Sequence, residues 1–287
     1  MLPITETAIN ISNNSSNSNE QLTAIVTTPA ETPLSDQPLI LIINSGLIVR
    51  TGPYRLHVTL ARQLAQLRFS CCRVDLSGIG DSDRVRTKQT NDWQPIDDIQ
   101  RVMDFLVGEN IAQSFIIMGI CTGADNAHKA MLSDHRVVGA ICIDGYSYPT
   151  IRYYCNHYLP RLIKWRTWKN AFSRLCERFT PEHTHTTHQA ATQALEYRWE
   201  LPEKKKTKAD FVAFIERNAK LLCIYSSDWP YNYTQQLADA FPDLTFAPHI
   251  SLAYLQDAKH TFPIKADRQR LITTIEQWLQ QHFMHKP

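Results

Sequence analysis

One stretch of the sequence, residues 115–127, sets the tightest limit on how this chain can fold. It begins with the apolar run Phe-Ile-Ile-Met, which is typical of a strand buried on both faces of a sheet. The run continues directly into the pentapeptide Gly-Ile-Cys-Thr-Gly at 119–123 and then into residues that favour helix. We therefore predict a sharp strand-to-helix turn with Cys121 at its apex.

Two glycines flank this turn, Gly119 before Cys121 and Gly123 after it. In a turn this tight a side chain at either position would collide with neighbouring backbone, which explains the glycines. Cys121 would then lie beside the start of a helix, where free N–H groups and the positive end of the dipole favour a thiolate. A buried free cysteine is more often a small apolar core residue, so the pentapeptide alone leaves both interpretations open.

Composition excludes several classes of protein. The chain has 287 residues, 30 of them basic and 28 acidic, and a net charge of +2 offers no footprint for nucleic acid or an anionic membrane surface. No signal-peptide pattern or membrane-spanning apolar run is present, so we expect a cytoplasmic chain without membrane insertion. Its seven cysteines form no Cys-x-x-Cys pair, which indicates reduced thiols and neither a disulfide framework nor a zinc site.

Apolar runs and amphipathic stretches alternate along the chain and indicate a mostly parallel, doubly wound α/β sheet with its sites at the carboxyl ends of the strands. Strands are predicted at 21–28, 39–43, 69–75, 115–118, 137–144, 220–226 and 250–255, and helices at 56–67, 95–107, 234–240 and 267–282. Tyr, Trp, Arg and His are enriched between 146 and 215. We predict that this interval is a helical cap inserted between two parts of one core, 1–145 and 216–287.

No motif predicts a cofactor or a metal. The strand at 69–75 runs into the glycine-rich stretch 75–82, which contains neither Gly-x-x-x-x-Gly-Lys nor a Gly-x-Gly-x-x-Gly that opens a helix. His183, His185 and His188 have a spacing that could bind a metal, but they stand in a Thr-rich stretch that is typical of an exposed loop. We predict that they belong to an exposed loop.

Four segments, taken in order, resemble motifs of the α/β-hydrolase family. Asn-Ser-Gly at 44–46 stands where the family has a His-Gly oxyanion turn, 75–82 resembles its Asp-x-x-Gly-x-Gly-x-Ser stretch, 119–123 its nucleophile elbow and 257–262 its histidine loop. The resemblance runs from about residue 20 to 285 apart from the cap, and it implies an α/β-hydrolase fold. Within the family the chain is most similar to bacterial serine-aminopeptidase-type hydrolases with Cys at the elbow, some of them exosortase-associated.

This resemblance, with the chain order nucleophile, acid, histidine, implies a catalytic triad. Cys121 would be the nucleophile, and His260, which follows the last strand, the general base. Asp228, just past the strand at 220–226, occupies the usual place of the acid. Asp144 also ends a buried strand and is the alternative acid, and either residue could instead be a turn-forming aspartate.

The oxyanion hole would consist of two backbone N–H groups, those of Thr122 and Leu47. Thr122 follows the nucleophile, and Leu47 follows the turn at 44–46. Because this turn is Asn-Ser-Gly where the family often has His-Gly, the position of the second donor is inferred by analogy.

A cysteine nucleophile favours activated acyl groups, because a thiolate attacks them readily and is a good leaving group. We expect a hydrolase, thioesterase-like or esterase-like, that acts on a small-molecule or carrier-bound acyl substrate through a covalent acyl-enzyme. One alternative is an acyltransferase or cyclase that passes the acyl group to an amine, alcohol or carbanion. The other is a non-catalytic binding or scaffold protein with a hydrolase fold.

Overall fold

The computed structural model describes residues 3–12, 20–30, 37–84, 94–163 and 201–284. The histidines at 183, 185 and 188 lie outside this part of the chain. Within it, no helix is long and apolar enough to cross a membrane.

An eight-stranded sheet forms the centre of the fold, with the strand order β1-β2-β4-β3-β5-β6-β7-β8. The first two strands form an antiparallel hairpin, β2 pairs antiparallel with β4, and all later pairs are parallel. The bounds are β1 (Ile4–Ser12), β2 (Gln21–Pro29), β3 (Leu39–Ile42), β4 (Cys71–Val74), β5 (Phe115–Ile120), β6 (Val137–Ile143), β7 (Lys220–Ser226) and β8 (Ile250–Leu255). Each strand predicted from its apolar run is present.

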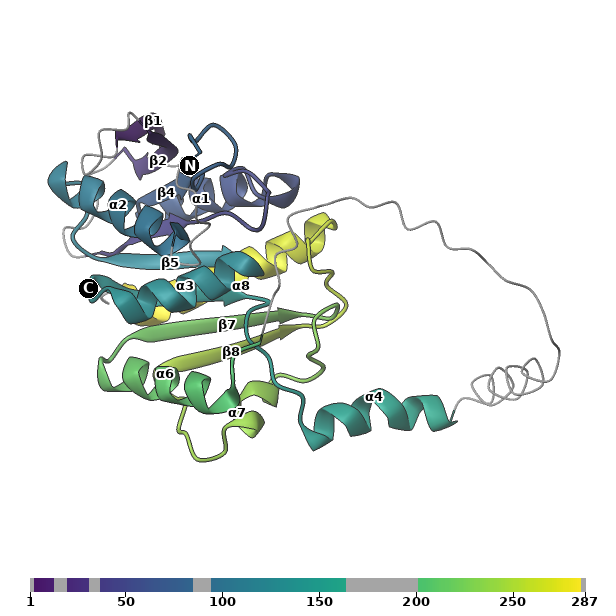
Figure 1. The fold of residues 1–287 in the computed structure, drawn as a ribbon. Coiled ribbons are helices and arrows are strands. Elements are labelled where there is room, and N and C mark those ends of the chain that lie inside the picture. Colours follow the sequence, from purple (N-terminus) through teal and green to yellow (C-terminus); the bar gives the residue numbers. More distant parts are fainter. Residues whose placement is uncertain (1–2, 13–19, 31–36, 85–93, 164–200, 285–287) are drawn as a thin grey trace, which may run out of the picture.

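Helices cover both faces of the sheet, as Figure 1 shows with α2, α3 and α6 in front of it and α8 behind. Apolar residues of α1 and α8 share one buried cluster, and those of α2, α3, α6 and α7 share the other. The bounds are η1 (Pro53–Arg55), α1 (Leu56–Gln66), α2 (Gln94–Gly108), α3 (Thr122–Ser133), α4 (Ile151–Ile163), α6 (Lys204–Glu216), α7 (Gln236–Ala240) and α8 (Lys265–Phe283). The predicted α/β-hydrolase architecture, a doubly wound and mostly parallel sheet, is confirmed.

The interval 146–215, predicted to be a cap, contains two helices with different surroundings. Phe211 and Phe214 of α6 are buried in the core cluster shared with α3, so α6 covers the sheet and is not part of a roof. In contrast, α4 extends away from the sheet in Figure 1, and Ile151, Tyr154 and Tyr158 on it are exposed. Residues 164–200, which hold most of the predicted cap, lie outside the described part of the chain.

Tyr148 joins the two ends of this interval. Its hydroxyl donates a hydrogen bond to the carbonyl oxygen of Pro202 at 2.9 Å and lies 2.6 Å from the hydroxyl of Thr207. Its side chain is buried, and its ring contacts Phe241 edge to face. The chain therefore leaves the core and returns to it at neighbouring points.

We expect Tyr148→Phe to lower the free energy of unfolding by about 1–3 kcal/mol, because two buried polar groups lose a partner. Urea denaturation would measure the change. The matched control is Tyr154→Phe, since Tyr154 is exposed, and it should change stability by less than about 0.5 kcal/mol. Equal stability of the two variants would contradict the role given to Tyr148.

Candidate active site

The turn between β5 and α3 holds Cys121 in a backbone conformation that residues other than glycine rarely adopt. Cys121 has φ 57° and ψ −118°, and its N–H donates to the carbonyl of Ile143 on β6 at 2.9 Å. A Cβ atom on Gly119 would lie 2.1 Å from the carbonyl carbon of Gly123, and one on Gly123 would lie 2.4 Å from the carbonyl oxygen of Asn44. The predicted need for glycine at both positions is confirmed.

The imidazole of His260 lies between Cys121 and a buried carboxylate. Its Nδ1 is 2.7 Å from Oδ2 of Asp144, and the side chain of Cys121 lies close enough to the ring to raise its pKa. Asp144 is fully buried at the end of β6, where it accepts hydrogen bonds from the N–H of Ser226 at 2.6 Å and its hydroxyl at 2.7 Å. The structure thus places a sulfur, an imidazole and a carboxylate in a continuous chain of contacts.

Asp228, which the sequence analysis ranks first as the acid, has different partners. Its carboxylate accepts a hydrogen bond from Lys259 Nζ at 2.8 Å and from the backbone N–H of His260 at 3.2 Å. The carboxylate on the imidazole belongs to Asp144, ranked second. The strands before both residues end at the same edge of the sheet, and at Asp144 a positive φ of 51° follows β6. The order of the two aspartates in the sequence does not reveal the turn at Asp144 that follows β6.

The pKa of His260 is raised from its ordinary value to about 10. The largest cause is the hydrogen bond to Asp144, followed by the one to Cys121, and partial burial opposes both. The folded protein therefore favours the imidazolium at neutral pH. Its contribution to stability is fully present below the unfolded pKa of 6.5 and is lost as the pH rises through about 10.

The turn at 44–46 is anchored to the nucleophile elbow. The N–H of Gly46 donates to the hydroxyl of Thr122 at 2.8 Å. The buried side chain of Asn44 accepts a hydrogen bond from the N–H of Leu76 at 2.6 Å and donates to Asp75 Oδ1 at 3.1 Å. Thr122 is the first residue of α3, where backbone N–H groups lack partners within the helix. Both predicted oxyanion donors thus lie on segments fixed next to Cys121.

Asp75 organises the loop on the other side of this turn. It is fully buried, accepts the backbone N–H of Arg50 at 2.6 Å and pairs with the Arg50 guanidinium, which also reaches Asp81 at 2.5 Å. A Cβ atom on Gly80 would lie 2.2 Å from Asp75 Oδ2. The glycine-rich stretch 75–82 therefore supports the oxyanion turn structurally.

Two residues of the site were not identified from the sequence. Ser226 binds both oxygens of Asp144, and Trp229 stacks on the imidazole of His260 with ring centroids 5.2 Å apart. Both lie at the carboxyl end of β7, and that position was the only signal that could have singled them out.

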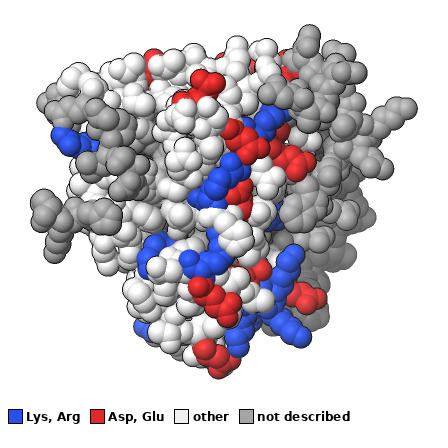
Figure 2. Space-filling model, turned by 90° about the vertical axis from the view of Figure 1, so that its left-hand side faces the viewer, with Lys and Arg blue, Asp and Glu red and all other residues white. Residues whose placement is uncertain are grey.

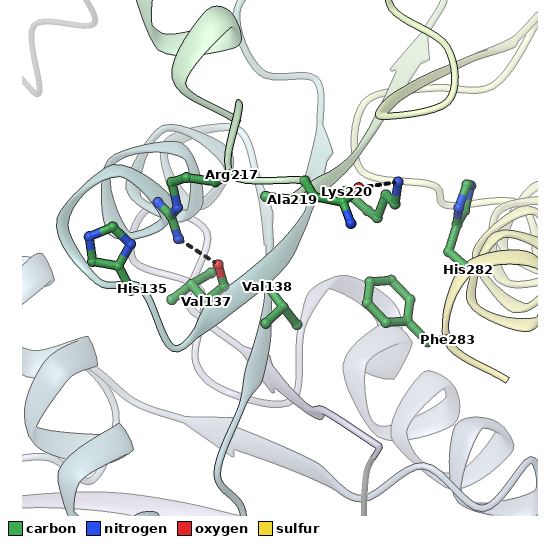
Figure 3. Close-up of a pocket in the computed structure, with 9 residues that line it drawn as sticks. His135, Val137, Val138, Arg217, Ala219, Lys220, His282 and Phe283 are labelled. Atoms are coloured by element: carbon green, nitrogen blue, oxygen red, sulfur yellow. Dashed lines mark hydrogen bonds between the residues drawn. The ribbon is translucent and has the colours of Figure 1, made fainter. Parts of the chain in front are cut away.

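A cavity of about 460 Å³ lies at the opposite edge of the sheet, at the amino ends of β6 and β7. Basic side chains line it, as Figure 3 shows for Arg217, Lys220 and His282. Arg217 donates to the carbonyls of Asp134 and Val137 just past the end of α3, at 3.2 and 3.1 Å. Arg217 also donates to the carbonyl of Met131 in the last turn of α3, so this cation caps the negative end of that helix. Cys121, Asp144 and His260 are not among the residues that line the cavity.

Neither surface charge nor clustered metal ligands indicate a further site in the part of the chain that the structure describes. On the face drawn in Figure 2, basic and acidic side chains are interleaved without a large patch of one sign. Among the residues that the structure describes, no group of three or more His, Cys, Asp or Glu side chains could hold a metal ion.

Solved structures with this fold include several hydrolases. A serine hydrolase without a lid from Xanthomonas campestris has 13% sequence identity and a TM-score of 0.58, with 100% of this chain and 99% of that chain covered. A Pyrococcus furiosus esterase has 10% identity and a TM-score of 0.59 over 98% and 92%. A dienelactone hydrolase from Anabaena variabilis has 14% identity and a TM-score of 0.57 over 98% and 99%. At these identities the likeness establishes the fold.

The sequence itself decides the family. A search of curated proteins finds no match. The family model described as serine aminopeptidase, S33, matches residues 38–217, which is more than half of the chain and includes the oxyanion turn, the elbow and Asp144. The chain therefore belongs to the serine aminopeptidase S33 family of α/β-hydrolases.

Proposed function

We propose that this protein hydrolyses activated acyl groups, esters or thioesters, with Cys121 as nucleophile, His260 as general base and Asp144 as the acid that orients the imidazole. The observation that carries the proposal is the chain of contacts from the Asp144 carboxylate through the His260 imidazole to the Cys121 sulfur, at a strained elbow beside two backbone turns. This differs from the first assignment made from sequence, in which Asp228 was the acid.

The reaction follows from these positions. The thiolate of Cys121 attacks the acyl carbon, and the N–H groups of Thr122 and Leu47 bind the oxyanion that forms. His260 then donates its proton to the departing alkoxide or thiolate, which leaves an acyl thioester on Cys121. Neutral His260 removes a proton from water, the resulting hydroxide attacks the thioester, and the acid leaves as the thiolate and imidazolium return. Each oxyanion donor contributes about 3 kcal/mol to stabilising the transition state.

The substrate class rests on the nucleophile and on the neighbouring structures. The elbow of this chain holds a cysteine, whereas one structural neighbour is described as an α/β serine hydrolase. A thiolate acts well on activated acyl groups. Two of the structural neighbours are described as an esterase and a dienelactone hydrolase. Leu47, at the oxyanion turn, is 82% exposed and offers an apolar contact at the mouth of the site. A small-molecule or carrier-bound acyl substrate fits these features.

The same acyl-enzyme would also serve an acyltransferase or a cyclase, in which an amine, alcohol or carbanion replaces water. We also propose that, within the family, the chain is most similar to bacterial hydrolases with cysteine at the elbow. A non-catalytic role is disfavoured by the elbow itself, because a strained φ at Cys121 would have no reason to persist in a scaffold protein.

Acyl adducts provide the direct test of this function. After brief exposure to short-chain acyl thioesters and p-nitrophenyl esters, intact-mass measurement should show one acyl group on the protein and none on Cys121→Ala. Decay of the adduct in buffer would support hydrolysis, whereas persistence until an amine is added would identify a transferase. Absence of any Cys121-dependent adduct across the panel would refute the proposal.

Alkylation tests the nucleophile independently of any substrate. At neutral pH iodoacetamide should label Cys121 faster than Cys155, which is exposed on α4, because the His260 imidazolium favours the reactive thiolate. His260→Gln should slow labelling of Cys121 at least tenfold and leave Cys155 unchanged. Equal rates at the two sites, read by peptide mass spectrometry, would argue against an activated thiol. The remaining described cysteines are buried and should react last: Cys71, Cys72, Cys142 and Cys223.

The two carboxylates can be separated by matched substitutions. Asp144→Asn should lower kcat/KM by roughly a thousandfold or more, since it removes the acceptor that sets the tautomer of His260. Asp228→Asn should cost less than about tenfold, because in the described part of the chain Asp228 bonds to the backbone of His260 and the side chain of Lys259 and not to the imidazole. Thermal melts by circular dichroism would control for folding. The reverse ranking would return the role of acid to Asp228.

A further inference from the structure

Trp229 lies flat against the catalytic imidazole. The ring centroids of Trp229 and His260 are 5.2 Å apart with an interplanar angle of 15°, which is a stacked arrangement. The indole Nε1–H donates to the carbonyl oxygen of Gly145 at 2.8 Å. Gly145 directly follows Asp144 in the chain. One side chain therefore contacts both the ring of His260 and the backbone beside its carboxylate partner.

Charged and titratable groups approach His260 from several elements, and Trp229 stacks on the face of its ring. Asp144 follows β6 and meets the ring nitrogen Nδ1 at 2.7 Å, and Cys121 stands at the start of α3, close enough to the ring to raise its pKa. Asp228, on the loop after β7, accepts the backbone N–H of His260 and pairs with the neighbouring Lys259. The negative face of an indole stabilises a cation within about 6 Å of its centroid.

The position of Trp229 is itself fixed by the fold. It follows Asp228 at the carboxyl end of β7, and its N–H is held by the segment that follows β6. Neighbouring contacts join the same two segments, since the Tyr225 hydroxyl donates to the carbonyl of Tyr146 at 2.5 Å and the Gln236 side chain donates to the carbonyl of Tyr148 at 3.3 Å. The indole is thus held rigidly where the imidazole meets it.

We propose that Trp229 is a positioning residue for the acyl transfer: its indole face stabilises the imidazolium of His260, and its hydrogen bond to Gly145 keeps that ring in line with Asp144. The proposal rests on the proposed function for its catalytic meaning, but the stacking can be tested without turnover. A purely structural role for Trp229 would leave the titration of His260 unchanged.

The imidazole alternates between charged and neutral forms during each catalytic cycle. The hydrogen bond that His260 donates to Asp144 and its contact with Cys121 change strength as the proton and the acyl group move, whereas a stacked ring contact is present in both forms. The indole would therefore limit rotation of His260 while Cys121 is acylated. Without Trp229, deacylation should suffer along with the first step, so kcat should fall more than KM rises.

Histidine titration by NMR on the full chain tests the electrostatic part. The signal of His260, assigned by its loss in His260→Gln, should titrate about 0.5 to 1 pH unit lower in Trp229→Leu than in the wild-type protein. Trp229→Phe keeps an aromatic face and should shift it less. The control is Trp278→Phe, since Trp278 contacts His282 at a 55° angle far along α8, and it should not move His260.

If Trp229→Leu does not fold, incorporating fluorinated tryptophan into the wild-type protein provides a second test of the stacking. Fluorination preserves the shape and N–H of the indole but weakens the negative face, so the pKa of His260 should fall in the labelled wild-type protein. In Trp229→Phe, which lacks this indole, fluorination of the other tryptophans should not lower the pKa of His260 further. An unchanged titration of His260 in both the fluorinated protein and Trp229→Phe would overturn the proposal.

Kinetics then separate this inference from the proposed function. With an acyl ester or thioester, Trp229→Leu should lower kcat about tenfold and change KM little, and Trp229→Phe should restore most of the loss. If no Cys121-dependent turnover occurs in the wild-type protein, the proposed function fails and the NMR result alone decides the stacking. If turnover occurs and Trp229→Leu leaves kcat unchanged, the positioning role is wrong.

Discussion

The site depends on a contact between two backbones, that of Gly123 at the start of α3 and that of Asn44 after β3. A single methyl group on Gly123 would lie 2.4 Å from the carbonyl oxygen of Asn44, so nothing larger than hydrogen fits there. This approach brings the first turn of α3 against the oxyanion turn, where the Gly46 N–H meets the Thr122 hydroxyl. This close backbone packing therefore fixes the turn at 44–46 against the start of α3, next to Cys121.

The two aspartates near His260 come from different strands of the sheet. Both β6 and β7 end beside the imidazole, and each provides an aspartate. Asp144 meets the ring because it is buried and bound by Ser226, whereas Asp228 lies further out, paired with Lys259. A buried carboxylate held by three donors has a fixed direction, which is what orienting an imidazole requires. Asp228 instead holds the backbone of the histidine loop.

Much of the fold and the centre of the site could be predicted because they follow from local patterns. Apolar runs identified every strand from β2 onward, and glycine spacing identified the elbow around Cys121. The choice between Asp144 and Asp228 could not be made, because it depends on a positive φ at Asp144 and on a distant partner, Ser226. Trp229 was not predicted, because no periodic pattern distinguishes it from the many other aromatic residues of the chain. The boundary of the cap was also obscured, because α6 has exposed lysines at its start although Phe211 and Phe214 are core.

The hydrogen bonds of Tyr148 have a consequence for the segment that leaves the core after β6. This tyrosine joins the residues before α4 to those at the start of α6. The two ends of the intervening chain are therefore held close together, as at the base of a closed loop. The entropic cost of such a loop grows only with the logarithm of its length, and each doubling adds about 0.6 kcal/mol. Changes in the length of the chain between these two points should therefore have little effect on the stability of the sheet.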